Sequence, residues 1–211
     1  MCERLKFEQE AYALGKKYIV GLDEAGRGPM AGPLVVGAVI FPQGYYNEKI
    51  NDSKKLTEKK REALYDVIIQ DALAYQIEII DVEMVDRLNV YQASKKGMLD
   101  AIQHLSIQPD YALTDAMPLG DVIEHQSIIK GDGKSLSIGA ASILAKVTRD
   151  RIMNEYAQIY PEYGFEKHKG YPTKQHKVAL KRYGVTPIHR RSFQPVIDVL
   201  NQQLSLFDDE I

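Results

Sequence analysis

Residues 18–28 read Tyr18-Ile-Val-Gly-Leu-Asp-Glu-Ala-Gly-Arg-Gly28, and they begin as the short apolar run of a buried β-strand. Two acids, Asp23 and Glu24, stand where that run ends. Because neighbouring side chains on a strand point to opposite faces, both acids can serve one site only if the chain turns there. An acidic pair alone is typical of a solvated turn, but its position directly after a buried strand favours a functional site at the rim of a sheet.

The residues that follow suit a turn and an anionic ligand. Gly26 and Gly28 reach backbone angles that other residues avoid, and they let a ligand approach the main chain. Arg27, between them, carries a planar guanidinium that matches a phosphate group. A second apolar run, residues 33–41, follows at once and predicts a neighbouring strand.

The rest of the chain mixes strand and helix patterns. They predict further strands at 74–81, 109–115 and 122–130, and helices at 3–17, 57–70, 82–88, 91–105, 136–160, 173–183 and 194–202. This order predicts an α/β fold: a mixed β-sheet flanked by helices, with a C-terminal helical region.

Composition excludes several classes of protein. The 211 residues are enough for one sizeable α/β domain, and no apolar run is long enough to span a bilayer. The N-terminus is charged where a secretory signal would be apolar. Cys2 is the only cysteine, which excludes a disulfide framework. We therefore expect a cytoplasmic protein without a membrane partner.

The net charge of −2 hides a segregation of charge along the chain. Residues 130–191 carry 13 Lys/Arg and 5 Asp/Glu, whereas residues 1–129 carry 14 and 20. The last twenty residues carry four acids and no base. A basic segment of this kind favours a phosphate backbone as partner, although a solvated helix face would show the same pattern.

Two further acids stand at later junctions of the chain. Asp115 ends the predicted strand 109–115, and Asp132 precedes the long predicted helix. Each alone is typical of a turn or a helix start. Together with Asp23 and Glu24 they make a carboxylate set without His or Cys partners, which suits Mg²⁺ or Mn²⁺. Such a set with two ions can hydrolyse a phosphodiester.

Other polar residues fit less specific roles. Asp150 follows Lys146 by four residues in the long predicted helix, which favours an intrahelical ion pair. His168 and His176 flank a basic loop, where they could contact phosphate or simply lie on the surface.

Five stretches match a known family in the same order along the chain. They are Gly21-Leu-Asp-Glu-Ala-Gly-Arg-Gly-Pro-Met-Ala-Gly-Pro33, Asp52-Ser-Lys-Lys-Leu56, Thr114-Asp-Ala116, Lys130-Gly-Asp132 with Ser137 to Arg151 behind it, and His168-Lys-Gly-Tyr-Pro-Thr173. Together they make the chain resemble bacterial ribonuclease HII, the type 2 ribonuclease H family. The likeness covers nearly the whole chain. We expect no long N-terminal extension of the kind found in the related ribonuclease HIII group, which favours ribonuclease HII.

The resemblance implies a fold, an activity and a catalytic set. The fold would be ribonuclease H-like, with an N-terminal helical extension (1–17), a catalytic domain (18–160), a C-terminal substrate-binding region (161–202) and a flexible acidic tail (203–211). The catalytic and metal-binding quartet would be Asp23, Glu24, Asp115 and Asp132, with two Mg²⁺ or Mn²⁺ ions. The enzyme would cut the RNA strand of RNA–DNA hybrids and nick 5′ to ribonucleotides embedded in duplex DNA, leaving 3′-hydroxyl and 5′-phosphate ends.

The resemblance also implies how substrate is held. The backbone of Gly26, Arg27 and Gly28 would read the ribose 2′-hydroxyl, which distinguishes RNA from DNA. Tyr171 would pack on the sugar of the following deoxynucleotide.

Lysines near these residues are candidates for phosphate contacts, which position a substrate without reading its sequence. The candidates beside the metal face are Lys54, Lys55, Lys130 and Lys134, and those of the C-terminal region are Lys169, Lys174, Lys177 and Arg182. For each lysine taken alone, the sequence favours a solvated surface role.

The end of the chain carries a separate signal, Gln203-Leu-Ser-Leu-Phe207. It resembles the pentapeptide with which bacterial repair proteins bind the DNA sliding clamp. Gln203, Leu204, Leu206 and Phe207 would then fill a groove on that partner. The alternative is that the helix 194–202 continues and packs Leu204 and Phe207 on the domain. Nothing in the sequence requires more than a monomer.

Two other functions fit parts of the pattern. A non-catalytic, clamp-tethered nucleic-acid binder would share the basic segment and the tail, but four acids beside phosphate would serve no purpose in it. A junction resolvase would share the metal site, but it would cut all-DNA junctions and ignore the 2′-hydroxyl.

Overall fold

The computed structural model of the chain describes residues 3–208, with side chains described up to residue 202. The strands are β1 (Ile19–Ala25), β2 (Leu34–Ile40), β3 (Ala74–Ile80), β4 (Tyr111–Asp115) and β5 (His125–Ile128). The helices are α1 (Lys6–Ala13), α2 (Glu58–Asp71), α3 (Val82–Leu88), α4 (Val90–His104), α5 (Leu136–Ile159), α6 (Phe165–His168), α7 (Lys174–Tyr183) and α8 (Gln194–Asp208), with short 3-10 helices η1 (Glu3–Leu5), η2 (Ser53–Lys55) and η3 (Gly131–Gly133).

The described chain forms two compact units, each discontinuous in sequence. Unit 1 contains the chain up to Ala25, Val35–Ile79 and Ser94–Thr148; unit 2 contains Gly26–Leu34, Ile80–Ala93 and the chain from Arg149 onward.

A five-stranded sheet forms the centre of unit 1, in the order β3-β2-β1-β4-β5. Strand β1 pairs antiparallel with β2 and parallel with β4, and β4 pairs parallel with β5. The predicted mixed sheet is therefore confirmed. Strand β5 is only four residues long, shorter than the predicted segment 122–130.

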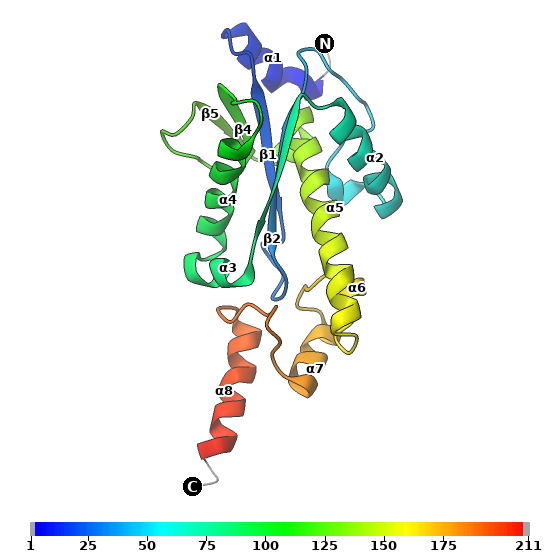
Figure 1. Cartoon of the computed structure of the whole chain (residues 1–211), viewed down its shortest axis with the longest axis vertical. Helices are drawn as coiled ribbons and strands as arrows, with labels where there is room; N and C mark the ends of the chain where they lie inside the picture. The colour runs from blue at the N-terminus through cyan, green and yellow to red at the C-terminus, as the bar shows by residue number, and fades with distance from the viewer. Residues whose placement is uncertain (1–2, 209–211) are drawn as a thin grey trace. The chain divides into compact units, whose positions relative to one another are not determined.

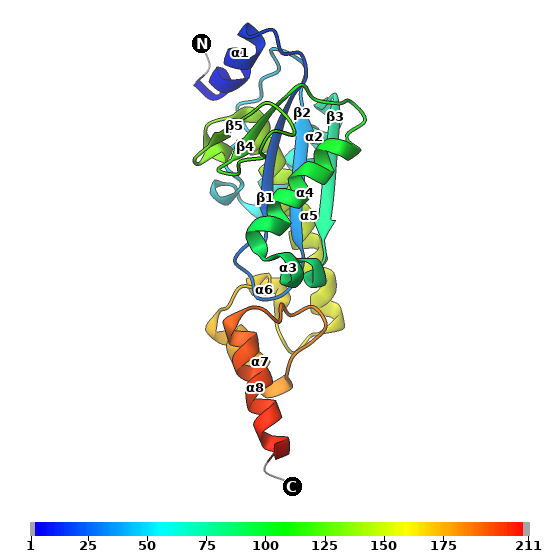
Figure 2. The ribbon, with the colours of Figure 1, turned by 90° about the vertical axis from the view of Figure 1, so that its left-hand side faces the viewer.

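Helices cover both faces of this sheet. Figures 1 and 2 show α4 on one face, and α5 with α2 on the other. The second layer shares a core in which Leu64 and Ile68 of α2 pack with Val39 of β2 and Leu144 of α5. The predicted α/β class, with helices flanking the sheet, is thus confirmed.

Two glycines let the start of α5 lie directly on the sheet. A Cβ atom at Gly21 of β1 would overlap the backbone of Ser137, and one at Gly37 of β2 would overlap the backbone of Ala141. Gly37 is also the partner of Asp23 across the strand pair. The close approach therefore fixes the beginning of α5, and with it the residues just before the helix, against the strand that carries Asp23.

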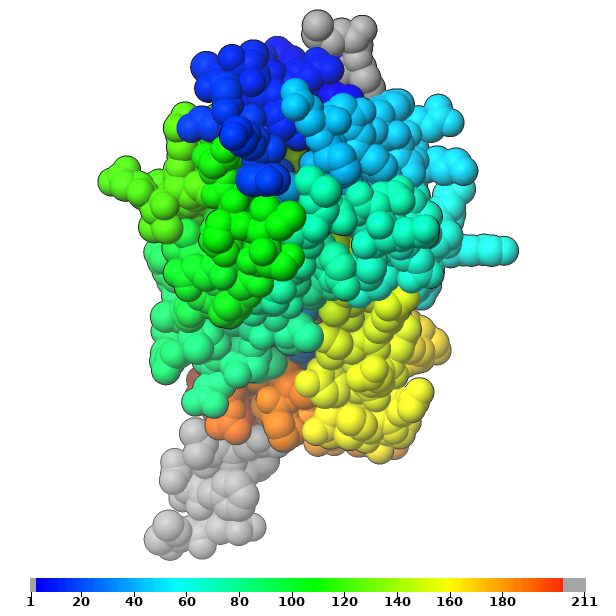
Figure 3. Space-filling model, turned by 45° about the horizontal axis from the view of Figure 1, so that its top comes forward, coloured from blue at the N-terminus to red at the C-terminus, as the bar shows by residue number. Residues whose placement is uncertain are grey.

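Helix α1 is hydrogen-bonded to the same end of α5. The buried Glu8 accepts hydrogen bonds from the hydroxyl groups of Ser135 (2.6 Å) and Ser137 (2.8 Å) and from the backbone N–H of Ser137 (3.0 Å). Figure 3 shows α1 (dark blue) beside the loop that follows β2 (light blue), and Tyr12 and Gly44 line the same hollow there.

Unit 2 has its own core, built around the segment Gly26–Leu34. Ala31 packs with Met153 of α5 and Phe165 of α6 in one cluster. Met30 packs with the buried residues of α7 and α8 in a second cluster. The segment that carries Gly26-Arg27-Gly28 is thus anchored in two apolar clusters, through Met30 and Ala31.

Helix α8 continues to Asp208, past the expected end at residue 202. The backbone of the Gln203–Phe207 segment is therefore part of α8, and the boundary of the expected tail at residue 203 stays a prediction. The side chains expected to bind a sliding clamp, those of Gln203, Leu204, Leu206 and Phe207, lie outside the residues whose side chains the structure describes.

Candidate active site

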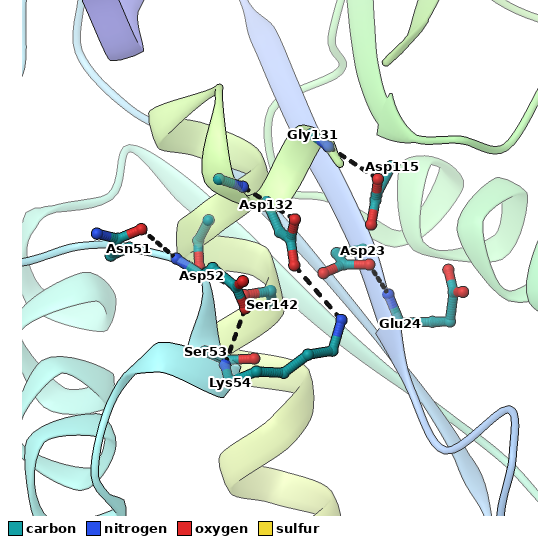
Figure 4. A network of polar contacts seen from close by, with 12 residues as sticks. Asp23, Glu24, Asn51, Asp52, Ser53, Lys54, Asp115, Gly131, Asp132 and Ser142 are labelled. Carbon is teal, nitrogen blue, oxygen red and sulfur yellow. Dashed lines mark hydrogen bonds and ion pairs between the residues drawn. The ribbon is translucent and has the colours of Figure 1, made fainter. Parts of the chain in front are cut away.

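Three of the four predicted acids meet in unit 1, near the C-terminal ends of the neighbouring strands β1 and β4. Asp23 lies on β1, Asp115 ends β4, and Asp132 lies in η3; each offers an oxygen, and the three oxygens lie within 4.8 Å of one another. The last register pair of the parallel strands β1 and β4 is Leu22 with Thr114, so the two acids follow it side by side. Figure 4 shows the three side chains pointing toward one another.

Backbone N–H groups fix one oxygen of each carboxylate. The N–H of Glu24 donates to Asp23 (2.7 Å), that of Gly131 donates to Asp115 (2.8 Å), and that of Gly133 donates to Asp132 (2.9 Å). These bonds orient the acids before any ligand arrives, as a preorganised site requires.

The turn between β5 and α5 brings Asp132 into this group. Lys130 adopts a left-handed backbone conformation, with φ of 58°. At Gly131 a Cβ atom would lie 2.7 Å from Ile138 Cδ1, so no larger residue fits there without a shift of its neighbours. The packing against Ile138 therefore explains the glycine in the Lys130-Gly131-Asp132 motif.

The negative charges of these acids repel one another. Burial, together with the charges of Glu24 and Asp115, raises the pKa of Asp23 well above its usual value. Burial and the charge of Asp115 also raise the pKa of Asp132. Like charges at this separation favour either protonation or the uptake of a cation, and an all-oxygen donor set fits a hard divalent ion such as Mg²⁺ or Mn²⁺.

Glu24 is not among the residues whose oxygens meet. Strand β1 stays extended through Ala25, so the side chain of Glu24 leaves the strand on the face opposite to Asp23. The turn expected at the two acids comes one residue after the strand, at Gly26, where φ is +105°. Glu24 still acts on the site through its charge, and its role as a metal ligand stays a prediction.

One of the predicted lysines reaches the acids. Lys54 Nζ lies 3.5 Å from Asp132 Oδ2, and its side chain is 79% exposed. Figure 4 marks this ion pair with a dashed line. Partial burial lowers the pKa of Lys54, but the charges of Asp132 and Asp23 outweigh that effect and leave the pKa raised. Lys55, the last residue of η2, and Lys134, directly after η3, are also exposed. Since an exposed ion pair contributes little stability, Lys54 can exchange Asp132 for a ligand at little cost.

Unit 2 brings together two of the predicted substrate-binding residues. A Cβ atom at Gly28 would lie 3.3 Å from Cε1 of Tyr171, so the tyrosine ring lies against this glycine. Tyr171 is 45% exposed, and Arg27 is exposed as well. Gly26 is buried, and a Cβ atom there would overlap Arg149.

Sequence reasoning missed two buried arginines that hold this segment. Arg149 donates to the carbonyl oxygens of Pro33 (3.0 Å), Ala31 (3.1 Å) and Lys169 (3.0 Å), which joins the glycine segment to the loop before Tyr171. Arg190 donates two hydrogen bonds to the carbonyl oxygen of Gly32 (3.0 and 2.9 Å). Burial lowers the pKa of Arg149 to about 10 and that of Arg190 to about 9.

The idea that His168 and His176 contact phosphate or lie on the surface is wrong. Both are buried in unit 2, and they hydrogen-bond to the carbonyl oxygens of Tyr163 (2.8 Å) and Tyr171 (2.9 Å). Nothing in the local sequence distinguishes them from surface histidines, because their partners come from the fold.

Within residues 3–208, no helix has the length and apolar character required to cross a membrane.

A family model described as Ribonuclease HII matches residues 20–196. The Ribonuclease HII of Bacillus cytotoxicus is 52% identical over 202 residues, which are 96% of this chain and 78% of the relative. The Ribonuclease HII of Acholeplasma laidlawii is 52% identical over 200 residues, which are 95% of this chain and 98% of the relative.

Solved structures share the fold. The ribonuclease H2 of Pyrococcus horikoshii OT3 gives a TM-score of 0.77 at 28% identity, covering 88% of this chain and 98% of that one. The PCNA:RNase HII complex of Archaeoglobus fulgidus gives 0.68 at 24% identity, with 82% and 92% covered. Bst-RNase HIII in complex with Mn²⁺ gives 0.66 at 16% identity, with 90% and 71% covered.

The ribonuclease H-like fold expected from the sequence is therefore confirmed. Because the family model covers most of the chain and both curated relatives align over nearly all of it, the chain belongs to the ribonuclease HII family and is a ribonuclease H.

Proposed function

We propose that this ribonuclease H cuts the RNA strand of RNA–DNA hybrids and also nicks duplex DNA on the 5′ side of an embedded ribonucleotide, with two-metal catalysis and with 3′-hydroxyl and 5′-phosphate ends as products. The observation that carries the proposal is the meeting of Asp23, Asp115 and Asp132, whose oxygens lie within 4.8 Å of one another. A cytoplasmic location and a monomeric state are part of the proposal.

The donor set fits the proposed ions. All three converging groups are carboxylates, and the raised pKa values of Asp23 and Asp132 reflect a cluster that needs positive charge. When bound, two divalent ions supply an activated water and stabilise the departing 3′-oxygen. Glu24 completes the proposed ligand set from the same strand. Because Bst-RNase HIII was solved in complex with Mn²⁺, Mn²⁺ and Mg²⁺ are the first ions to test.

The contact between Gly28 and Tyr171 supports recognition of a ribose joined to a deoxyribose. A glycine leaves main-chain groups open to a ligand, and the tyrosine ring that lies against Gly28 is partly exposed. In the proposal, the backbone of residues 26–28 binds the 2′-hydroxyl and Tyr171 packs on the next sugar. The 2′-hydroxyl is the group that separates RNA from DNA at such a site.

The exposed lysines are proposed to hold the phosphate backbone. Lys54 Nζ lies 3.5 Å from Asp132 Oδ2, and Lys55 and Lys134 are exposed close to Lys54 and Asp132 in sequence. Contacts of this kind position a duplex without reading its bases.

The proposed protein partner is a DNA sliding clamp, bound through Gln203, Leu204, Leu206 and Phe207. The Archaeoglobus fulgidus structure contains PCNA together with RNase HII, which supports a clamp as the partner to test. Deletion of residues 203–211 should abolish binding to a bacterial clamp in a pull-down with purified proteins and leave cleavage of a short hybrid unchanged. Equal clamp binding by the truncated chain would remove this part of the proposal.

The decisive experiment compares two duplexes that differ by a single oxygen atom. One carries a lone ribonucleotide in DNA, and its twin carries the deoxynucleotide at the same position. We expect cleavage of the first only, 5′ to the ribonucleotide, dependent on Mg²⁺ or Mn²⁺ and absent in Asp23→Asn. Equal cleavage of both duplexes, or cutting of all-DNA junctions, would identify a resolvase instead. Binding without cleavage in any metal would identify a non-catalytic binder.

A further inference from the structure

Unit 2 contains a buried group of histidines that the proposed function does not use. His168, His176 and His189 are 8%, 0% and 1% exposed. The rings of His168 and His176 stack 4.5 Å apart, and the Nε2 atoms of His176 and His189 lie 3.1 Å apart. Three of the chain's five histidines therefore lie together in one interior cluster.

The hydrogen bonds that join Thr186, His189, His176 and Tyr171 can run in only one direction. The backbone N–H of Thr186 donates to His189 Nδ1 (3.1 Å), so a neutral His189 carries its proton on Nε2. That proton is donated to Nε2 of His176. A neutral His176 then carries its own proton on Nδ1, which lies 2.9 Å from the carbonyl oxygen of Tyr171. A carbonyl oxygen can only accept, so this last bond also joins a donor to an acceptor. We call this series of hydrogen bonds, from Thr186 through His189 and His176 to Tyr171, the relay.

The interior keeps these rings neutral. Burial lowers the pKa of His176 to about 4 and that of His189 to about 3. A charged imidazole has donors on both nitrogens, so protonation of either ring would leave one N–H facing another donor. At neutral pH each ring therefore has one tautomer, fixed by its partners.

The relay ends at the residue whose ring lies against Gly28. The carbonyl oxygen of Tyr171 accepts from His176, and its N–H donates to the carbonyl oxygen of His168 (2.9 Å). His168 also accepts from the N–H of Gly170 (3.3 Å), the residue before the tyrosine. The backbone of Tyr171 is thus held from both sides, while its ring stays partly exposed.

We propose that His176, held in one tautomer by His189, is a positioning residue that sets the orientation of Tyr171 and thereby the preference for a ribonucleotide followed by a deoxynucleotide. The inference rests on the proposed function for its readout. His176 itself touches no substrate; it acts by fixing the carbonyl group of the residue that does.

Two substitutions of His176 separate positioning from packing. In His176→Asn the amide nitrogen occupies the place of Nδ1, so the donor to Tyr171 is kept and the contact to His189 is lost. In His176→Gln the amide oxygen takes the place of Nε2 and accepts from His189, so the contact to His189 is kept and the donor to Tyr171 is lost. Each variant loses one buried hydrogen bond, and thermal melting should show comparable losses of stability.

The measured quantity is kcat/KM on a duplex with one embedded ribonucleotide, divided by kcat/KM on an all-RNA strand paired with DNA. The ratio should fall by about tenfold in His176→Gln, the effect of one lost hydrogen bond, and change by less than about threefold in His176→Asn. Tyr171→Ala should lower the same ratio, and adding His176→Gln to it should lower the ratio no further, because both act through one side chain. Equal falls in the Asn and Gln variants, or additive losses in the double variant, would overturn the positioning role.

Two further readouts separate a failure of the relay from a failure of the proposed function. Nitrogen-15 NMR of the histidine rings at neutral pH should show protons on Nδ1 of His176 and on Nε2 of His189; other tautomers would overturn the relay whatever the kinetics. If the tautomers are as expected but Tyr171→Ala leaves the ratio unchanged, the proposed role of Tyr171 fails, and the positioning role falls with it.

Discussion

Replacing Asp23 by asparagine should make the metal-free protein more stable while it destroys the activity. Coulomb's law gives about 3.5 kcal/mol for two unit charges 4.8 Å apart at an effective dielectric constant of about 20, and about 0.9 kcal/mol in water. Asp23 faces two such neighbours, Asp115 and Asp132, as well as the charge of Glu24, and Lys54 offsets part of the charge of Asp132. The amide oxygen of asparagine can still accept the hydrogen bond from the N–H of Glu24. We therefore expect a gain of about 1 to 3 kcal/mol, or about 3 to 9 °C in Tm for a chain of this size.

The assay is thermal unfolding with a chelator and then with increasing Mg²⁺ or Mn²⁺. The wild type should melt below Asp23→Asn in the chelator and gain stability as metal is added, because a ligand that binds only the folded state stabilises it. The variant should gain much less. Asp121→Asn removes an exposed acid and serves as the matched control, with a small change in either condition. If Asp23→Asn melts at or below the wild type in the chelator and gains as much from metal, the three acids do not form a mutually repelling, cation-binding cluster.

Three other outcomes follow from the structure. Gly37→Ala should destabilise the protein by about 1 to 3 kcal/mol in urea unfolding, since its methyl group would overlap the backbone of Ala141; an unchanged midpoint would contradict the close packing of α5 on the sheet. The pKa values of His176 and His189 are lowered to about 4 and 3, so the unfolded chain binds more protons below pH 6.5, and stability should be complete above that pH and fall as pH drops toward 4. His189→Gln should make that pH dependence shallower in melting curves, and an unchanged slope would argue against a buried neutral pair. Lys54→Gln should weaken substrate binding equally for all sequences and lower the slope of log affinity against log salt by about 1, as a single phosphate contact would; an unchanged slope would place Lys54 outside the interface.

The positions of Asp23 and Asp115 could be predicted because each stands where an apolar strand pattern stops. Parallel neighbouring strands bring such positions to the same side of a sheet. Asp132 could be placed only loosely, since its approach depends on the turn at Lys130 and on the close packing at Gly131. Both are properties of the folded backbone.

Glu24 shows that two acids adjacent in the sequence need not point in the same direction. The adjacent acids suggested a turn that would bring both into one group, but β1 stays extended through Ala25 and separates their directions. Period-two geometry overrides adjacency in sequence whenever the strand continues.

The supports of the tyrosine loop could not be predicted. Arg149 and His176 have carbonyl oxygens as partners, and any residue supplies such an oxygen. A buried cation or imidazole without an acidic partner leaves no pattern in the sequence, because its hydrogen bonds are satisfied only after distant segments meet.

The most direct test of the central claim is anomalous X-ray scattering from crystals grown with Mn²⁺ and an uncleaved substrate duplex. The account predicts manganese peaks in bonding contact with Asp23, Asp115 and Asp132, beside the phosphate that precedes the ribonucleotide. A crystal with the duplex bound but without manganese at these three carboxylates, or with manganese only at other residues, would contradict it.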